Sequence, residues 1–289
     1  MLFANLHNHS TFSDGVWTPE QLADLAVKQG HKAIVLTDHD TAQGTYFMKK
    51  AARLRGLYCL TGTEFEGEGF GTDFHIVGFD YNTEDKEIRE ILDYLSKKQR
   101  ERTKILFDWA IEKGNISGIT WQEVLNENPY NDYICNNHIW RLLVKKGLWD
   151  EKDYFKFFEF FKWFPPREDE IQKILKMPAL DVGVIIKSIV KAGGVPVWAH
   201  PRKNEVELIF ELKKLGLMGV EINHPEIDPK IIPTLIAYAD KLNLYKSGGS
   251  DHSGVLGGFI DQNPDYIIPD NVGGIGEEEF FDLYLRRKG

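Results

Sequence analysis

Short apolar runs alternate with stretches of helical spacing near both ends of the chain. Seven apolar runs predict β-strands, over residues 2–6, 33–36, 57–60, 74–79, 195–198, 219–222 and 244–248. Helices are predicted between and after them, over residues 18–30, 181–192, 203–215, 229–242 and 277–287. The first helix has the clearest signals, because Thr18 and Gln21 form a capping box and Pro19 suits the first helical position. Strands joined mostly by helical crossovers predict an α/β fold with a parallel barrel of about seven strands.

This alternation stops between residues 83 and 177. The segment predicts one long helix over 84–114 and shorter helices over 121–126 and 137–146. We interpret it as a helical lid domain inserted after the fourth strand. The barrel domain then consists of residues 1–82 and 178–289, and the lid consists of residues 83–177.

The end of the predicted lid is dense in aromatic side chains. Eight fall within residues 154–164, namely Tyr154, Phe155, Phe157, Phe158, Phe160, Phe161, Trp163 and Phe164. We favour packing inside the lid as their role, over a wall that stacks a nucleobase or a contact between two copies of the chain.

The chain is net acidic, and this narrows the classes of partner. A formal charge of -9 argues against binding to long nucleic acid, because attraction to phosphates drives that binding. A small phosphorylated substrate is compatible with the charge, since bound metal ions can dominate a pocket. Cys59 and Cys135 lie far apart and match no thiolate metal pattern, which favours a reducing, cytoplasmic location. With neither a signal-peptide pattern nor an apolar stretch of about 20 residues, we expect no membrane association.

Histidines and acids follow or lie within the predicted strands. They are His7, His9, Asp14, His39, Glu64, His75, His200 and Asp251. Because the C-terminal ends of parallel strands meet at one end of a barrel, we expect these side chains to form a multinuclear metal site. Each alone has a plainer interpretation, as a hydrogen-bonded core histidine, an exposed strand residue or a helix cap at Asp40 or Thr41. Asp38 is a candidate partner that orients a ligand imidazole.

Several short motifs carry a family resemblance. They are His7-Asn8-His9, Asp14-Gly15, Thr37-Asp38-His39, Ala199-His200-Pro201 and Gly249-Ser250-Asp251. With Glu64 and His75 they resemble the PHP (polymerase and histidinol phosphatase) family of metal-dependent phosphoesterases, in particular its members with a helical lid. The resemblance covers residues 1–82 and 178–289. It implies a distorted, TIM-like barrel of seven strands, two or three divalent ions of manganese, iron or zinc, and no organic cofactor.

The resemblance also implies how the ligands are shared. His7, His9, Glu64 and Asp251 would hold the first ion, and Glu64, His75 and His200 the second. Asp14 and His39 would hold a third, usually completed by a histidine two residues after the last aspartate. Here that position is Ser253, and the histidine is His252, one place early. A shift of one residue on extended backbone turns the side chain to the other face, so either the loop lets His252 bind or the third ion is weak or absent.

The implied activity is phosphoester hydrolysis. Bound cations lower the pKa of a bridging water enough to make hydroxide, which attacks phosphorus in line. His39, His200 and Asp14 are the candidate catalytic residues, with the two imidazoles able to protonate a leaving alkoxide. The preferred substrate is a nucleotide, a nucleoside bisphosphate or another small phosphomonoester. Alternatives are an exonuclease on short oligonucleotides, a metal-dependent C–N hydrolase and a metal-binding module without turnover.

Candidate substrate contacts come from the lid and from two strand ends. Residues 136–144 resemble the lid segment of PHP enzymes that act on nucleotide-like phosphoesters, which often begins Arg-Pro-His. Here only His138 is kept, and asparagines replace the other two. Arg141 in the same segment, Arg202 and Lys246 are further candidates for phosphate binding. A plainer interpretation places His138 near a helix cap and the cations on the surface.

Overall fold

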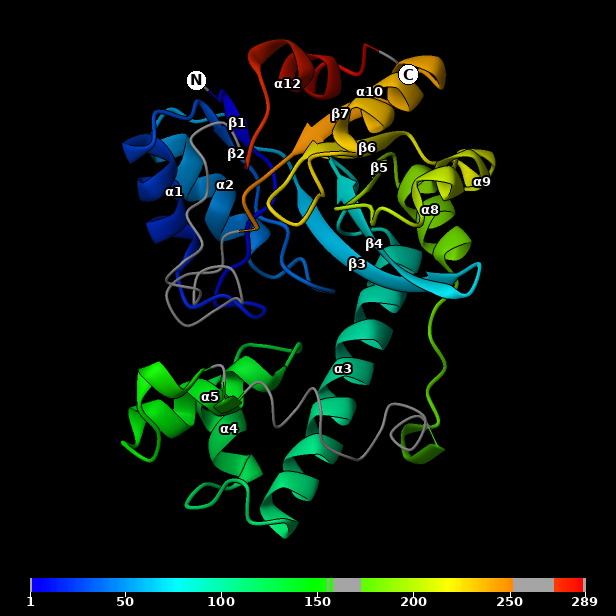
Figure 1. Cartoon of the computed structure of the whole chain (residues 1–289). Coiled ribbons are helices and arrows are strands. Elements are labelled where there is room, and N and C mark those ends of the chain that lie inside the picture. The colour runs from blue at the N-terminus through cyan, green and yellow to red at the C-terminus, as the bar shows by residue number, and fades with distance from the viewer. Residues whose placement is uncertain (1, 155, 158–172, 252–272, 288–289) are drawn as a thin grey trace.

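The computed structural model describes residues 2–154, 156–157, 173–251 and 273–287, and within them the strands form two sheets (Figure 1). In the first, β1 (Ala4–Asn5) pairs in parallel with β2 (Ala33–Ile34). The second has the order β3 (Gly62–Gly69), β4 (Thr72–Phe79), β5 (Val195–Trp198), β6 (Gly219–Asn223) and β7 (Tyr245–Gly248). The α/β class that the alternation predicted is therefore correct.

Strand β4 runs antiparallel to both of its neighbours, β3 and β5, and here the expectation of a parallel strand was wrong. Phe70 and Gly71 form a two-residue turn between β3 and β4, with φ angles of 52° and 82°. So short a connection can only join antiparallel strands, whereas a parallel pair needs a crossover of a dozen residues or more.

The third strand was also misplaced by the sequence pattern. The run at residues 57–60 contributes only an isolated bridge between Ala33 and Tyr58, and β3 begins later, at Gly62. Because acidic residues occupy alternate positions of β3, this strand contains no apolar run and the sequence pattern did not predict it. Glu64 consequently lies inside a strand rather than beyond the end of one.

Backbone hydrogen bonds also cross between the two sheets. The Leu6 amide donates to the Gly248 carbonyl (3.1 Å), and the Asp251 amide donates to the His7 carbonyl (2.9 Å). These two bonds join the chain at the ends of β1 and β7. On the other side, the Asp40 amide after β2 donates to the carbonyl of Glu64 in β3 (2.9 Å).

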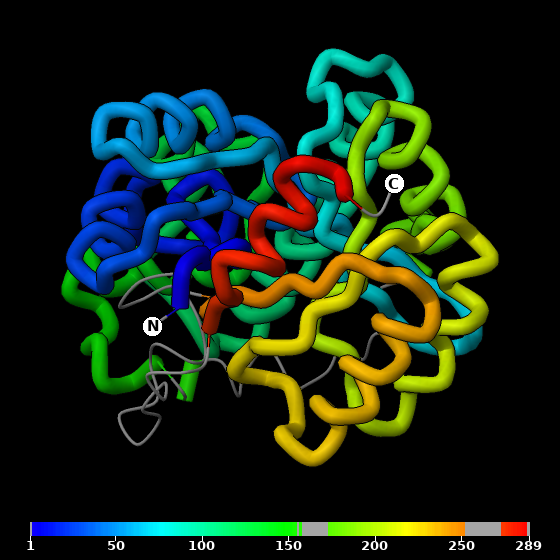
Figure 2. The backbone as a smooth tube through the Cα atoms, turned by 90° about the horizontal axis from the view of Figure 1, so that it is seen from above, coloured from blue at the N-terminus to red at the C-terminus, as the bar shows by residue number. Residues whose placement is uncertain are grey.

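Helices cover the outer faces of the sheets. They are α1 (Pro19–Lys28), α2 (Thr45–Leu54), α8 (Val182–Lys191), α9 (Ile209–Leu215), α10 (Ile232–Lys241) and α12 (Glu277–Tyr284). The capping box of Thr18 and Gln21 at α1 is confirmed. Side chains from β1, β2, β4, β5 and β7 share one buried apolar cluster, which Phe280 and Leu283 of α12 also enter. Figure 2 shows α12 lying across this end of the molecule.

A separate group of helices follows β4. It contains α3 (Lys86–Glu112), α4 (Trp121–Glu127) and α5 (Asn136–Lys145), which have their own apolar core. Trp140 lies at its centre, with ring centroids 5.6 Å from Tyr154 and 5.1 Å from Phe157. Core packing therefore holds for these two aromatics, and the other six of residues 154–164 lie outside the described residues. No helix in the described part of the chain, α3 included, is both long and apolar enough to cross a membrane.

Candidate metal centre

The carboxylate of Glu64 is the centre of a cluster of imidazoles at one end of the strands. Its side chain is 1% exposed, and five histidines contact it: His7, His9, His39, His75 and His200. The Oε1 atom of Glu64 is 2.9 Å from His75 Nδ1 and 3.0 Å from His200 Nε2. His75 lies in the first half of β4. Because β4 is antiparallel to β5, its N-terminal half lies at the end of the sheet where the parallel strands finish, and this brings His75 to the cluster.

The second oxygen of Glu64 contacts the histidines that follow β1 and β2. Oε2 is 3.0 Å from His7 Nε2 and 3.3 Å from both His9 Nε2 and His39 Nδ1. The side chains of His7 and His9 point to the same place, as their spacing of two predicted, and their Nε2 atoms are 3.2 Å apart.

Two aspartates complete the cluster. His9 Nε2 is 2.8 Å from Asp251 Oδ1, and His9 Nδ1 is 3.5 Å from Asp14 Oδ1. The structure thus brings together all eight predicted ligands that it describes, whereas His252 lies outside the described residues.

The donor set fits divalent cations. Within the described residues, four trios have ligand atoms mutually within 4.8 Å: His7, His9 and Glu64; His9, Asp14 and His39; His39, Glu64 and His75; and His7, His224 and Asp251. The Nδ1 atoms of His9 and His39 are buried and have no hydrogen-bond partner in the described part of the chain. Buried polar atoms normally have a partner, so converging imidazoles with unused nitrogens are what a metal site requires.

The imidazoles and carboxylates of the cluster shift one another's pKa values. Burial opposes the charged form of Glu64, but the surrounding imidazoles lower its pKa well below the usual range. Burial alone would lower the pKa of His7, yet Glu64 and Glu221 raise it well above the usual range, and the pKa of His75 rises to about 9 for a similar reason. Without cations, His7, His9 and His75 therefore hold protons that balance the acids, and metal binding at these rings must release them.

Glu221 of β6 belongs to the site and was missed in the sequence. Its Oε1 atom is 2.9 Å from His7 Nδ1, and its Oε2 atom accepts a hydrogen bond from the His200 amide (2.9 Å). The only indication in the sequence was that Glu221 is a single acid within the apolar run 219–222, and this pattern does not predict which residue the acid contacts.

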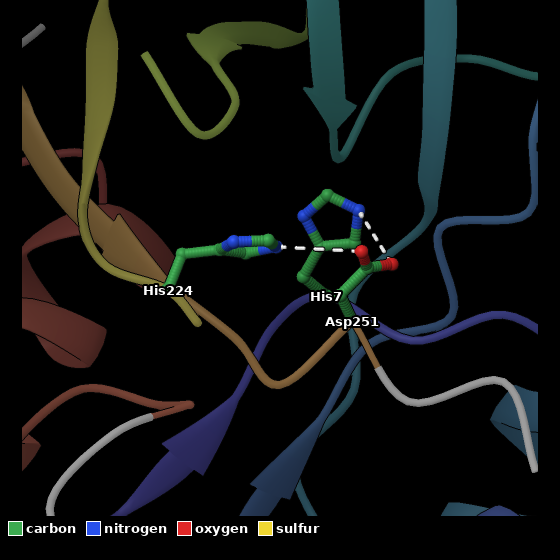
Figure 3. Close-up of side chains that lie close together, drawn as sticks. All are labelled: His7, His224 and Asp251. Atoms are coloured by element: carbon green, nitrogen blue, oxygen red, sulfur yellow. Dashed lines mark ion pairs between the residues drawn. The ribbon is translucent and has the colours of Figure 1, made fainter. Parts of the chain in front are cut away.

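His224, which follows β6, was also missed. Its Nε2 atom is 3.8 Å from Asp251 Oδ2, and its ring centroid is 5.0 Å from that of His7 and 4.9 Å from that of His200 (Figure 3). Burial outweighs the attraction of Glu221 and lowers the pKa of His224 to about 4. A sequence signal did exist, because a His-Pro pair follows β6 just as His200 and Pro201 follow β5.

Asp38 has a different role from the predicted one. Its carboxylate accepts hydrogen bonds from the Ser10 amide (2.6 Å), the Ser10 hydroxyl (2.8 Å) and the Ser13 hydroxyl (2.7 Å), rather than from an imidazole. It thereby fixes the loop that carries Asp14. Asp40 caps no helix, and its Oδ1 atom instead accepts the Glu66 amide (3.0 Å).

Three residues of the cluster region have strained backbone conformations. Asp40, His200 and Asp251 adopt left-handed conformations, with φ angles of 50°, 29° and 53°. Residues other than glycine avoid this region, and such outliers gather at functional sites. Gly249 packs so closely on His7 that a Cβ atom there would lie 2.2 Å from it.

Of the predicted substrate contacts, Arg202 lies beside the cluster and Lys246 does not. Arg202 lines a cavity of about 390 Å³ that also reaches His75, and its side chain is 62% exposed. Lys246 Nζ is 2.7 Å from Asp240 Oδ1, on the outer helix α10, so the structure does not bring it to the site.

Residues of the helical segment dock on the loop that carries Asp14. Arg141 donates a hydrogen bond to the carbonyl of Gly15. His138 is buried as a cap of α5, where its Nδ1 accepts the Cys135 amide (3.1 Å) and burial lowers its pKa. The plainer interpretation of His138 as a cap thus describes its contacts. Tyr133, which no sequence pattern singled out, stacks on His39 with ring centroids 5.9 Å apart.

Comparison with known proteins identifies the family. A PHP domain model matches residues 5–162, more than half of the chain, and the chain therefore belongs to the PHP domain family. A 3′,5′-nucleoside bisphosphate phosphatase of Chromobacterium violaceum is 28% identical over 259 residues, which cover 86% of each chain. A 5′-3′ exoribonuclease of Haemophilus influenzae is 27% identical over 254 residues, covering 86% of this chain and 88% of that protein.

A solved structure agrees on the fold. A candidate metal-dependent phosphoesterase from Bifidobacterium adolescentis superposes with a TM-score of 0.77 at 24% sequence identity, covering 99% of this chain and 96% of that one. Family membership, the relatives and the cluster around Glu64 together define the chain as a metal-dependent phosphoesterase.

Proposed function

We propose that this enzyme hydrolyses a small phosphorylated substrate: a nucleotide, a nucleoside bisphosphate or another phosphomonoester. The observation that carries the proposal is the single buried carboxylate of Glu64 in contact with five imidazoles, since a carboxylate with two oxygens can serve two cations at once. The bisphosphate phosphatase of Chromobacterium violaceum, which matches over 86% of both chains, supports the substrate class.

Two or three divalent ions would share these ligands. The proposed sets are His7, His9, Glu64 and Asp251 for one ion, Glu64, His75 and His200 for the second, and Asp14 with His39 for a third. The third set needs a further ligand, for which His252 is the sequence candidate. Manganese, iron and zinc all suit imidazole and carboxylate donors.

Bound ions would supply Lewis acidity, which activates water and neutralises charge on the phosphoryl oxygens. The chain itself provides the proton donors. His39 and His200 lie at the edge of the cluster, each 15% exposed, and either would protonate a leaving alkoxide where its imidazole is not fully used in holding a cation. Asp14, next to His9, is the third catalytic candidate.

The cavity beside His75 is the proposed place for the rest of the substrate. Its volume of about 390 Å³ lies within the range of small-molecule sites, and Lys98, Arg102 and Arg202 line it. Arg202 would contact a phosphate through its planar guanidinium, and Arg141, which donates one N–H to the Gly15 carbonyl, would offer its other N–H groups from the lid side. We leave His138 and Lys246 out of the contacts, because their nitrogens are engaged elsewhere.

We further propose that the strands form one closed, TIM-like barrel of seven strands covered by the helical lid. The hydrogen bonds of Leu6 to Gly248 and of Asp40 to Glu64, which link the two sheets at both borders, support closure. The separate apolar core around Trp140 supports a barrel domain of residues 1–82 and 178–289 with a lid of 83–177. Two free cysteines agree with a cytoplasmic location.

A second candidate function is trimming of short oligonucleotides from an end. The Haemophilus influenzae relative is an exoribonuclease. Phe12, in the loop after His9, stacks on Phe47 with ring centroids 5.3 Å apart, and the neighbouring Tyr46 is 70% exposed. Exposed rings near a phosphoesterase site can stack successive bases.

The test is phosphate release by the manganese-loaded protein from sugar phosphates, mononucleotides, nucleoside bisphosphates and short oligonucleotides, with His9→Ala as the blank. Release from a small substrate, absent in the blank, is the expected result. Faster cleavage of oligonucleotides would favour the second candidate. No release from any substrate by protein shown to bind metal would overturn the proposal in favour of C–N hydrolysis or a module without turnover.

A further inference from the structure

The imidazole of His224 has a fixed tautomer. The backbone amide of Glu226 donates to its Nδ1 atom at 3.1 Å, within the tight turn that Pro225 forms after β6. A ring nitrogen that accepts a hydrogen bond carries no hydrogen, so the hydrogen of this imidazole is on Nε2. His224 therefore presents a hydrogen-bond donor, rather than a lone pair, at Nε2.

That donor is buried and aimed at Asp251. His224 is 2% exposed, and its Nε2 atom has no hydrogen-bond partner among the described residues. The nearest acceptor in an ion pair is Asp251 Oδ2, at 3.8 Å (Figure 3). Because Nε2 is shielded from solvent, it is also shielded from a substrate in the open cavity, and its partner is either a protein group or a buried cation.

Asp251 is held so that its two oxygens have different surroundings. Its backbone is in the left-handed region, with φ at 53°, and its amide donates to the His7 carbonyl at 2.9 Å. Oδ1 faces the cluster, 2.8 Å from His9 Nε2 and 3.8 Å from His7 Nε2, while Oδ2 faces His224.

We propose that His224 is a positioning residue that donates its Nε2 hydrogen to Asp251 Oδ2 and so reserves Oδ1 for the cation shared with His7 and His9. The inference rests on the proposed function, since it concerns the same metal site. The proposal requires the gap of 3.8 Å to shorten to about 3 Å in the metal-bound protein.

The competing assignment makes His224 a metal ligand. Ligation through Nε2 requires the hydrogen to sit on Nδ1, where it would face the hydrogen of the Glu226 amide. The turn would have to break that hydrogen bond before His224 could bind a cation.

The experiment measures manganese binding to chelator-treated protein by electron paramagnetic resonance of the free ion. His224→Phe keeps a ring but removes the donor, and His224→Gln restores a donor amide near the Nε2 position. We expect His224→Phe to weaken binding of the affected ion by about 10- to 100-fold, as for other residues that orient metal ligands. The manganese affinity of His224→Gln should lie within about 3-fold of that of the unsubstituted protein. His31→Phe, at a buried histidine just before the start of β2 and so at the opposite end of that strand from His39, is the matched control and should leave affinity unchanged.

Three results would overturn the inference. Loss of one ion equally in His224→Phe and His224→Gln would make His224 a ligand, and no change in either would leave it without a role at the metal. Equal weakening of manganese binding by His31→Phe would show that the effect comes from altered core packing and not from the lost donor of His224. If His224→Phe does not fold, His224→Leu replaces it. Because binding is measured without turnover, a protein that binds manganese but cleaves no phosphoester would refute the proposed function and still test His224.

Discussion

Glu221 Oε1 lies 2.9 Å from Nδ1 of His7, and both side chains are fully buried. The carboxylate accepts a hydrogen bond from Nδ1, so the proton that His7 gives up on metal binding is the one on Nε2, which faces Glu64 and the rest of the cluster. A glutamate on β6 thus decides which nitrogen of a histidine after β1 can bind a cation.

This pairing predicts the behaviour of Glu221→Gln. The amide keeps the shape but has one acceptor oxygen, so it cannot accept both the Nδ1 hydrogen of His7 and the His200 amide hydrogen, and manganese affinity should fall by about 10- to 100-fold. Titration of the metal-free protein with manganese checks this. Glu211→Gln, on the surface of α9, is the control and should have the manganese affinity of the unsubstituted protein. Unchanged affinity in Glu221→Gln would show that Glu221 does not orient His7.

Glu64→Gln should remove activity without unfolding the chain. Only one of its atoms can then bind a cation, so we expect turnover to fall by at least about 10³-fold, as when a group acting directly in the transition state is lost. Circular dichroism should show unchanged secondary structure. Near-normal turnover would refute the proposed bridging role.

The metal-free protein should lose stability as the pH rises. His7, His9 and His75 have pKa values raised by their carboxylates, so their contribution is fully present below the unfolded value of about 6.5 and is lost as pH rises through the folded values, about 9 for His75. Metal binding needs the deprotonated rings, so stabilisation by manganese should grow over the same window. Melting temperatures with chelator and with manganese, between about pH 6 and 8.5, test both trends. A metal-free melting temperature that rises across this window would contradict the assignment.

Both cysteines should resist alkylation in the folded protein. Burial raises the pKa of Cys59 and of Cys135 to about 12 each, so almost no thiolate is present near neutral pH. Mass spectrometry after iodoacetamide treatment should find both thiols unmodified under native conditions and both modified in denaturant. Rapid labelling of native Cys135 would show that the lid segment opens readily at α5.

Gly249→Ala should weaken metal binding, which a glycine substitution that only strains the backbone should not do. Its Cβ would meet His7 at 2.2 Å, so either the strand end or the imidazole must move. Gly71→Ala is the comparison, because its turn has φ at 82° with open space around the Cβ position, and we expect it to cost about 1 to 2 kcal/mol. Urea unfolding and manganese titration separate the two effects, since only Gly249→Ala should weaken metal binding. Equal metal affinity in both variants would show that His7 tolerates the displacement.

Much of the site was predictable because its ligands carry local signals. The spacing of two between His7 and His9 predicts that both side chains point the same way, and His200 is followed by a proline at a strand end. Such signals depend only on neighbouring residues, which is why the capping box of Thr18 also appeared as predicted. His224 was missed although its His-Pro pair repeats that of His200.

What the sequence determined by itself is the alternation of strands and helices and the kind of chemistry, because apolar periodicity and residue type are properties of short segments. The tertiary structure alone decided that β4 is antiparallel, that Glu221 holds His7 from 214 residues away, and that Lys246 turns outward to Asp240. These outcomes depend on which strands become neighbours and which face of each strand turns inward. Neither is encoded within a short segment, since both follow from burying the apolar side chains of distant segments in a common core.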